Sequence, residues 1–192
     1  MGRCGRSELL WIVLSACDGG GRTLETDADV PCTVVVRYDW DDGSTQGWSA
    51  STTVSNPGTR LVVLNQGNGS LQAFGPEAGY SLADTDEISF MVQIDEYSAV
   101  TAPSELVNSS FAYNTPMPGD GSLRFALDMS MLTFGQPRTF TLPVSAGAFT
   151  GALTRSAFLA HAKFPSLMFT DNGFAANTSA ATLDNFVVGC AR

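Results

Sequence analysis

Apolar side chains occupy every second position between Leu123 and Met131, in the order Leu, Phe, Leu, Met, Met. Side chains of a β-strand point alternately to opposite faces, so this pattern predicts a strand with one face buried and the other at the surface. Such half-buried strands are typical of antiparallel sheets, because strands of parallel sheets are covered on both faces. The segment therefore indicates a largely antiparallel β fold.

Other short segments rich in β-branched and aromatic residues are separated by Gly, Pro, Asn and Asp turns. We expect further strands at 32–38, 48–54, 60–65, 70–74, 87–94, 110–113, 139–144, 166–170 and 182–189. One helical window, 154–163, carries a small apolar stripe. Many short strands joined by turns predict an all-β chain, an antiparallel β-sandwich of the jelly-roll type with one short helix.

The composition limits the class of protein and of partner. A chain of 192 residues with 44% hydrophobic and 15% charged residues suits one folded domain and argues against disorder. The formal net charge of -9 argues against nucleic acid as a partner, because phosphate binding needs a cationic face. An acidic surface suits divalent cations or neutral ligands such as glycans.

The first residues predict export. A short basic start is followed by an apolar run, 9–16, that is too short to cross a bilayer and has the proportions of a signal-peptide core. It ends in Leu-Ser-Ala-Cys, 14–17, which resembles the lipobox of bacterial lipoproteins. We expect a signal peptide at 1–16, a lipidated Cys17 with a tether at 17–31, and a β-sandwich domain at 32–190. The alternative is a secretory signal cleaved near Ala16.

A lipidated chain of this kind faces the periplasm or the cell exterior and touches the membrane only through its lipid anchor. Cys32 and Cys190 bracket the domain and fall in the first and last predicted strands. An oxidising compartment allows them to form a disulfide. On the chain-entropy model, a loop of this length stabilises the fold by roughly 4 to 5 kcal/mol. Two free buried thiols are the alternative.

The residues for catalysis are sparse. His161 is the one histidine and has no nucleophile motif beside it, so a solvated position at the end of the helix is expected. Paired carboxylates, as in glycosidases, occur at Asp84, Asp86 and Glu87 and at 95–96, where solvated turns explain them. We expect no enzyme activity, with a glycoside-acting enzyme as the remote alternative.

An acidic cluster, Asp39-Trp40-Asp41-Asp42-Gly43, lies at the end of the first predicted strand. Calcium prefers several carboxylates together with carbonyl oxygens from a turn. Asp184, in the last predicted strand, completes a site with Asp39 or Asp41 if the two terminal strands are neighbours. Such an ion would be structural. An ordinary acidic turn is the alternative.

The order of several motifs resembles laminin B (laminin IV) domains and bacterial carbohydrate-binding-module-like jelly rolls. These motifs are the aromatic-acidic start at 38–48, the segments 138–144, 149–150, 154–159 and 165–169, and the closing Leu-Asp-Asn-Phe-Val at 183–187. The resemblance implies a galactose-binding-like jelly roll with a binding or structural role outside the cell. It also implies structural calcium at Asp41 and Asp184, with Asp39 as a further candidate.

The aromatic residues bear on the choice of ligand, because sugar-binding modules present exposed rings as stacking platforms. Tyr80, Tyr97 and Tyr113, in or beside predicted loops, are the candidates. We interpret the chain as a non-catalytic envelope lipoprotein with a laminin B-like adhesion module that binds an extracellular protein. The alternative is a calcium-stabilised carbohydrate-binding module that binds a glycan.

Overall fold

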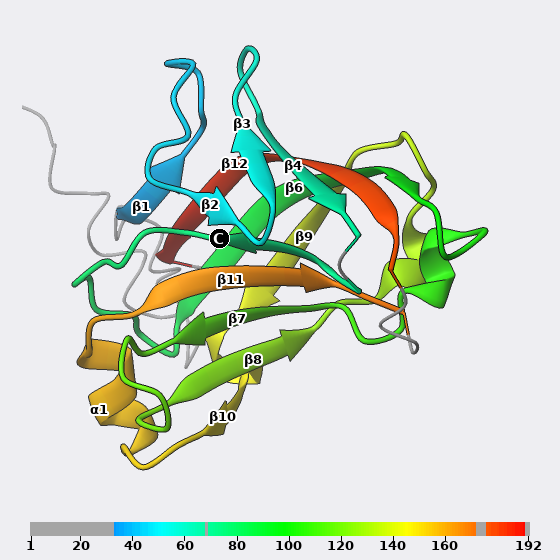
Figure 1. Ribbon diagram of the computed structural model, residues 1–192. Coiled ribbons are helices and arrows are strands. Elements are labelled where there is room, and N and C mark those ends of the chain that lie inside the picture. Colours follow the sequence, from blue (N-terminus) through cyan, green and yellow to red (C-terminus); the bar gives the residue numbers. More distant parts are fainter. Residues whose placement is uncertain (1–32, 68, 172–175, 191–192) are drawn as a thin grey trace, which may run out of the picture. The chain divides into compact units, whose positions relative to one another are not determined.

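The computed structural model describes residues 33–67, 69–171 and 176–190, which lie within one compact unit, 32–192. Two antiparallel six-stranded sheets form a sandwich (Figure 1). Sheet A contains β1 (Val34–Tyr38), β3 (Thr53–Ser55), β4 (Leu61–Gln66), β6 (Asp86–Tyr97), β9 (Arg138–Pro143) and β12 (Thr178–Cys190). Sheet B contains β2 (Ser49–Ala50), β5 (Leu71–Phe74), β7 (Ser110–Asn114), β8 (Ser122–Ala126), β10 (Ala148–Thr150) and β11 (Phe164–Phe169). The predicted all-β antiparallel sandwich is confirmed.

Strand β12 lies in the middle of sheet A, in the order β3-β4-β12-β6-β9. Its first half pairs with β4 and its second half pairs with β1, while β6 runs along its other side. The change of partner coincides with a bulge at Asn185, whose φ of 50° is left-handed. The terminal strands β1 and β12 are therefore neighbours, which was the condition for a site that joins Asp184 to Asp39 or Asp41.

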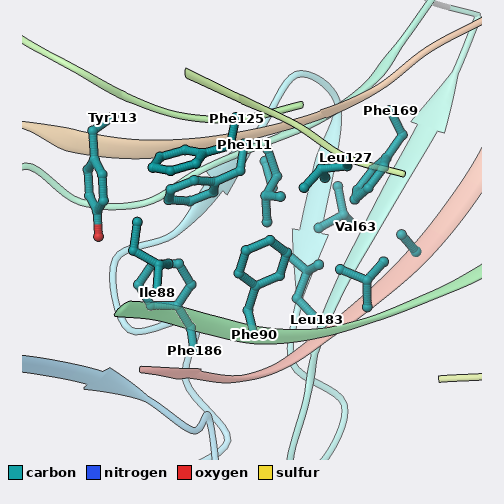
Figure 2. Packing of buried hydrophobic residues seen from close by; sticks show 14 of the residues in the cluster. Val63, Ile88, Phe90, Phe111, Tyr113, Phe125, Leu127, Phe169, Leu183 and Phe186 are labelled. Carbon is teal, nitrogen blue, oxygen red and sulfur yellow. The ribbon is translucent and has the colours of Figure 1, made fainter. Parts of the chain in front are cut away.

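The core fills the space between the sheets and is rich in phenylalanine. Phe90 and Phe186 of sheet A face Phe111 and Phe125 of sheet B (Figure 2). The ring centroids of Phe111 lie 5.4 Å from Phe90 and 5.9 Å from Phe186. Ring pairs at such distances add to the stabilisation that burial provides. Within each strand the core side chains alternate with side chains that point outward from the sandwich.

The strongest alternating segment forms a strand over only half its length. Strand β8 ends at Ala126, and a 3-10 turn, η2 (Met129–Met131), follows it. The carboxylate of Asp128 accepts hydrogen bonds from the backbone N–H and the hydroxyl of Ser130, which caps the turn. Leu127 and Met129 are still buried, whereas Met131 is 62% exposed. The predicted strand at 123–131 is corrected to a strand and a turn.

The one α-helix, α1 (Arg155–Ala160), lies inside the predicted window and is shorter than it. The Thr154 hydroxyl accepts from the Ala157 N–H and caps its first turn. Phe158 and Leu159 bury the apolar stripe. Two more 3-10 turns, η1 (Pro103–Glu105) and η3 (Val144–Ala146), join strands. None of the helices in the described residues is long and apolar enough to span a membrane.

Candidate functional site

The outer face of sheet B carries small and neutral polar side chains in rows that cross the sheet. The register of the strands sets one residue of each strand in a single row across all six strands. That row consists of Ser49, Phe74, Ser166, Ala112, Arg124 and Ala148. A parallel row on one side contains Phe164, Asn114, Ser122 and Thr150, and the row on the other side contains Gln72, Met168, Ser110 and Ala126.

A depression of about 200 Å³ lies over these rows, across β5, β11, β7 and β8. Its floor is low because Ser166 and Ala112 stand between the larger Phe74 and Arg124 in the central row. We call this depression the sheet B groove. A second hollow of about 210 Å³ adjoins it and shares Asn114 and Ser122 with it.

The amide side chains of the groove keep hydrogen-bonding capacity for a ligand. The Asn114 amide donates to the Ser166 hydroxyl at 2.9 Å, and the Gln72 amide donates to the Ser70 hydroxyl at 2.6 Å. Within the part of the chain that the structure describes, the amide oxygens of Asn114 and Gln72 accept no hydrogen bond. Each amide is therefore held in place by one bond and offers an acceptor toward the groove.

Phe74 gives the groove an apolar wall. Its side chain is half-buried and lines the groove, and it does not belong to the core cluster between the sheets. Phe164 follows the same outward alternation on β11 and also lies outside that cluster. An aromatic ring on an outer face, beside free amide groups, is the combination that binds the apolar face and the hydroxyl edge of one ligand.

The tyrosines predicted as stacking platforms face inward instead. Tyr113 is fully buried and Tyr97 is 2% exposed. The Tyr80 hydroxyl donates to the Tyr113 hydroxyl at 2.8 Å, and the Tyr97 hydroxyl donates to the carbonyl of Gly69. Burial raises the pKa of all three phenols above the ordinary value. Strand register turns Tyr97 and Tyr113 toward the interior, which contradicts a glycan platform at these two residues, and Tyr80, outside the strands, is partly buried against the core.

Asp39 and Asp41, in the acidic loop after β1, lie in the same region as Asp184 of β12, but the three carboxylates do not form a cluster. Asp184 forms an ion pair with Arg60 at 3.5 Å, and the Asp39 carboxylate accepts from the Gln46 amide at 3.3 Å. Burial raises the pKa of Asp184, and the charges of Asp41 and Asp39 add to that shift. Among the described residues, no three His, Cys, Asp or Glu side chains are close enough to hold a metal.

Calcium at Asp39, Asp41 and Asp184 therefore stays a prediction. Arg60 supplies the positive charge beside Asp184 that an ion would otherwise provide. Melting in calcium and in chelator measures the site directly, because an ion that binds only the folded chain raises its stability.

The cysteine predictions extend beyond the described residues. Cys190 ends β12 and takes part in a disulfide. Cys32, its predicted partner, and the lipidation candidate Cys17 lie outside the described residues, as does the predicted tether at 17–31. The pairing and the lipid anchor stay predictions.

Three of the carboxylates considered for catalysis, Asp84, Asp86 and Asp95, have structural partners. Asp84 pairs with Arg155 at 2.8 Å, and Asp86 accepts the N–H of Ala83. Asp95 accepts from Gln93 and Thr182 on sheet A. His161 follows α1, is exposed, and has its Nδ1 3.0 Å from the carbonyl oxygen of Ala162. The site that the structure does offer, the sheet B groove, contains none of these residues.

Comparison with known proteins yields likeness of structure alone. Neither the known families nor the curated proteins contain a match to this sequence. Among solved structures, the tandem CBM22-1–CBM22-2 domain of Paenibacillus barcinonensis Xyn10C is 14% identical, with a TM-score of 0.53. The alignment covers 85% of this chain and 51% of that one.

Two further structures align at lower scores. The CBM22-1 xylan-binding domain of the same enzyme is 13% identical over 83% of this chain and 95% of its own, with a TM-score of 0.49. A xylan-binding module, CBM15, is 15% identical over 84% of this chain and 98% of its own, with a TM-score of 0.48. At such low identity the comparison shows the fold: a β-sandwich jelly roll of the kind found in carbohydrate-binding modules.

Proposed function

We propose that the domain is a non-catalytic carbohydrate-binding module that holds a polysaccharide in the sheet B groove. The observation that carries the proposal is the groove itself, where Phe74, outside the core, lines the same depression as the free amide oxygens of Asn114 and Gln72. A sugar unit has an apolar ring face and a rim of hydroxyls, so a ring and amides together match both of its surfaces.

The structure that aligns at a TM-score of 0.53 is named as a tandem CBM22-1–CBM22-2 domain, a likeness of fold that supports this proposal. No contact among the described residues favours the laminin B-like adhesion role, which stays a prediction from the order of motifs.

Binding to a panel of plant, algal and bacterial polysaccharides, measured by calorimetry, tests the proposal. We expect the Phe74→Ala and Asn114→Ala variants to lose at least about tenfold in affinity, the loss expected for one buried contact of 1.4 kcal/mol or more. Met91→Ala, a truncation on the half-buried outer position of β6 in sheet A, is the matched control. Wild-type affinity in both groove variants would refute the proposed site.

We also propose that the domain acts outside the cytoplasm, on a lipid anchor at Cys17. The support is the signal-like start and the lipobox-like 14–17 in the sequence. Labelled palmitate in growing cells should mark the wild-type protein and leave Cys17→Ser unmarked. Equal labelling of the two proteins would exclude the anchor at this residue.

A further inference from the structure

Arg124 lies in the central row of the sheet B groove, between two alanines. In the register of the sheet it pairs with Ala112 on β7 and with Ala148 on β10. Both neighbours end at Cβ, so the exposed guanidinium has free space on either side. Its strand position directs it to the groove, which it lines.

The guanidinium of Arg124 has no partner within the described residues, unlike two other arginines. Arg155 binds the Asp84 carboxylate and the carbonyl oxygens of Gly147 and Val144. Arg60 forms an ion pair with Asp184. Arginine presents five N–H donors in a planar fork, and in Arg124 all of them remain for a ligand.

No acidic residue lines the groove or the hollow beside it, although the chain has 19 Asp and Glu against 10 Lys and Arg. The nearest acids in the sequence, Asp120 and Asp128, lie four residues from Arg124 and beyond the two ends of β8. The groove is locally cationic on an acidic protein.

We propose that the polysaccharide held in the sheet B groove is a uronic acid polymer, and that Arg124 binds one of its carboxylates. The inference rests on the proposed function. A uronic acid differs from a neutral hexose by a carboxylate in place of a hydroxymethyl group, so the ring still packs on Phe74. The planar fork of Arg124 matches the two carboxylate oxygens by parallel N–H donations. A neutral polymer would leave this charge without a partner in the groove.

The test measures affinity for alginate, polygalacturonate and glucuronoxylan, each before and after its carboxylates are reduced to alcohols. Reduction keeps the backbone and replaces each carboxylate by an uncharged hydroxymethyl group. We expect wild type to bind at least one acidic polymer about tenfold or more tightly than its reduced form, the size of a charge-assisted hydrogen bond. Arg124→Gln should abolish that preference and retain the affinity for the reduced form. Arg124→Lys should keep part of it, because the charge remains without the fork.

Arg37→Gln is the control, since it removes the same charge from the outer face of sheet A. It should keep the full preference for the acidic polymer. An equal loss in Arg37→Gln and Arg124→Gln would show a general charge effect and overturn the assignment. Equal affinity of wild type for acidic and reduced polymers would overturn the inference and leave polysaccharide binding intact. Binding to no polymer of either kind would refute the proposed function itself.

Discussion

The outer faces of the two sheets arise from the same alternation of side chains, yet their polar groups are used differently. On sheet A, Asp95 accepts hydrogen bonds from Gln93 and Thr182, and Asp184 pairs with Arg60. On sheet B, the groove amides each keep a free oxygen, and Arg124 has no partner among the described residues. Pairing within the chain therefore takes these polar groups of sheet A away from a ligand, whereas those of the groove stay available.

A hollow on sheet A sharpens this contrast. It has a volume of about 340 Å³ and lies over β1, β12 and β6, so it is larger than the groove. It contains both Arg37 and Glu87, so it offers a ligand no net charge, and no aromatic ring lines it. The hollow on sheet A is the larger of the two, but only the sheet B groove offers a ligand a net charge and an aromatic ring.

Removal of a shared core ring should damage both faces at once and have the largest effect. Phe111 is fully buried and contacts the rings of Phe90, Phe125 and Phe186. Phe111→Ala should lower the free energy of unfolding by about 3 to 5 kcal/mol, because it removes buried surface and leaves a cavity. Urea unfolding measures the loss. A loss below about 1 kcal/mol would mean that the sheets do not depend on this contact.

A large side chain on the groove floor should separate binding from stability. Ala112 points into the groove between Ser166 and Arg124. Ala112→Trp should fill the depression and reduce polysaccharide affinity by more than about tenfold, equivalent to 1.4 kcal/mol. The melting temperature should change little, since the added ring projects outward. Unchanged affinity with a folded variant would place the ligand elsewhere.

Arg124 in the groove and Lys163 in the interior should differ in how their contributions to stability depend on pH. Lys163 is fully buried, donates to the carbonyl oxygens of Tyr80 and Leu159, and burial lowers its pKa to about 8. Above pH 8 the folded chain loses this proton while the unfolded chain, with an ordinary lysine, keeps it. The unfolded state then binds more protons, so the contribution of Lys163 to stability rises with pH.

Between pH 7.5 and 9.5 we expect wild type to gain about 1 to 2 kcal/mol relative to Lys163→Met, at 1.36 kcal/mol for each pKa unit. Urea unfolding of both proteins at the two pH values gives this difference, and subtraction removes the titration of the tyrosines. Arg124→Gln should track wild type throughout. A constant difference between wild type and Lys163→Met would show that the folded lysine has an ordinary pKa.

The smallest effect is expected on sheet A. Asp95→Ala removes the acceptor of Gln93 and Thr182, so stability should fall by about 0.5 to 1 kcal/mol, the value of exposed hydrogen bonds. Polysaccharide affinity should stay at the wild-type value. A loss of binding in this variant would show that the two faces are not independent and would remove the basis of the comparison.

The strands were predictable from the sequence where alternation and turn residues coincide, as at β4, β5 and β7. The end of β8 was not, because Leu127 and Met129 stay buried through a turn that Asp128 caps, and this preserves the alternation of apolar residues. Alternation reports burial, and Leu127 and Met129 are buried although neither lies in a strand.

The groove could not be found from the sequence. Gln72, Asn114, Arg124 and Ser166 come from four strands, and only the register of the sheet puts them on one face. A shift of one residue would have turned each inward. The same uncertainty explains the error at Tyr113, which occupies the position next to Asn114 and faces the core. The one indication of the groove in the sequence was that Phe74 and Phe164 fall at the outward-facing positions of their strands.

The central place of β12 has a consequence for the order of events during synthesis. β12 is the last strand of the domain to be made, and it holds β1, β4 and β6 in sheet A. Until Thr178–Cys190 has left the ribosome, these three strands have no central partner, and the contacts that complete the sheet span most of the sequence. In a nascent chain of this design, sheet A therefore cannot be completed until β12 has emerged.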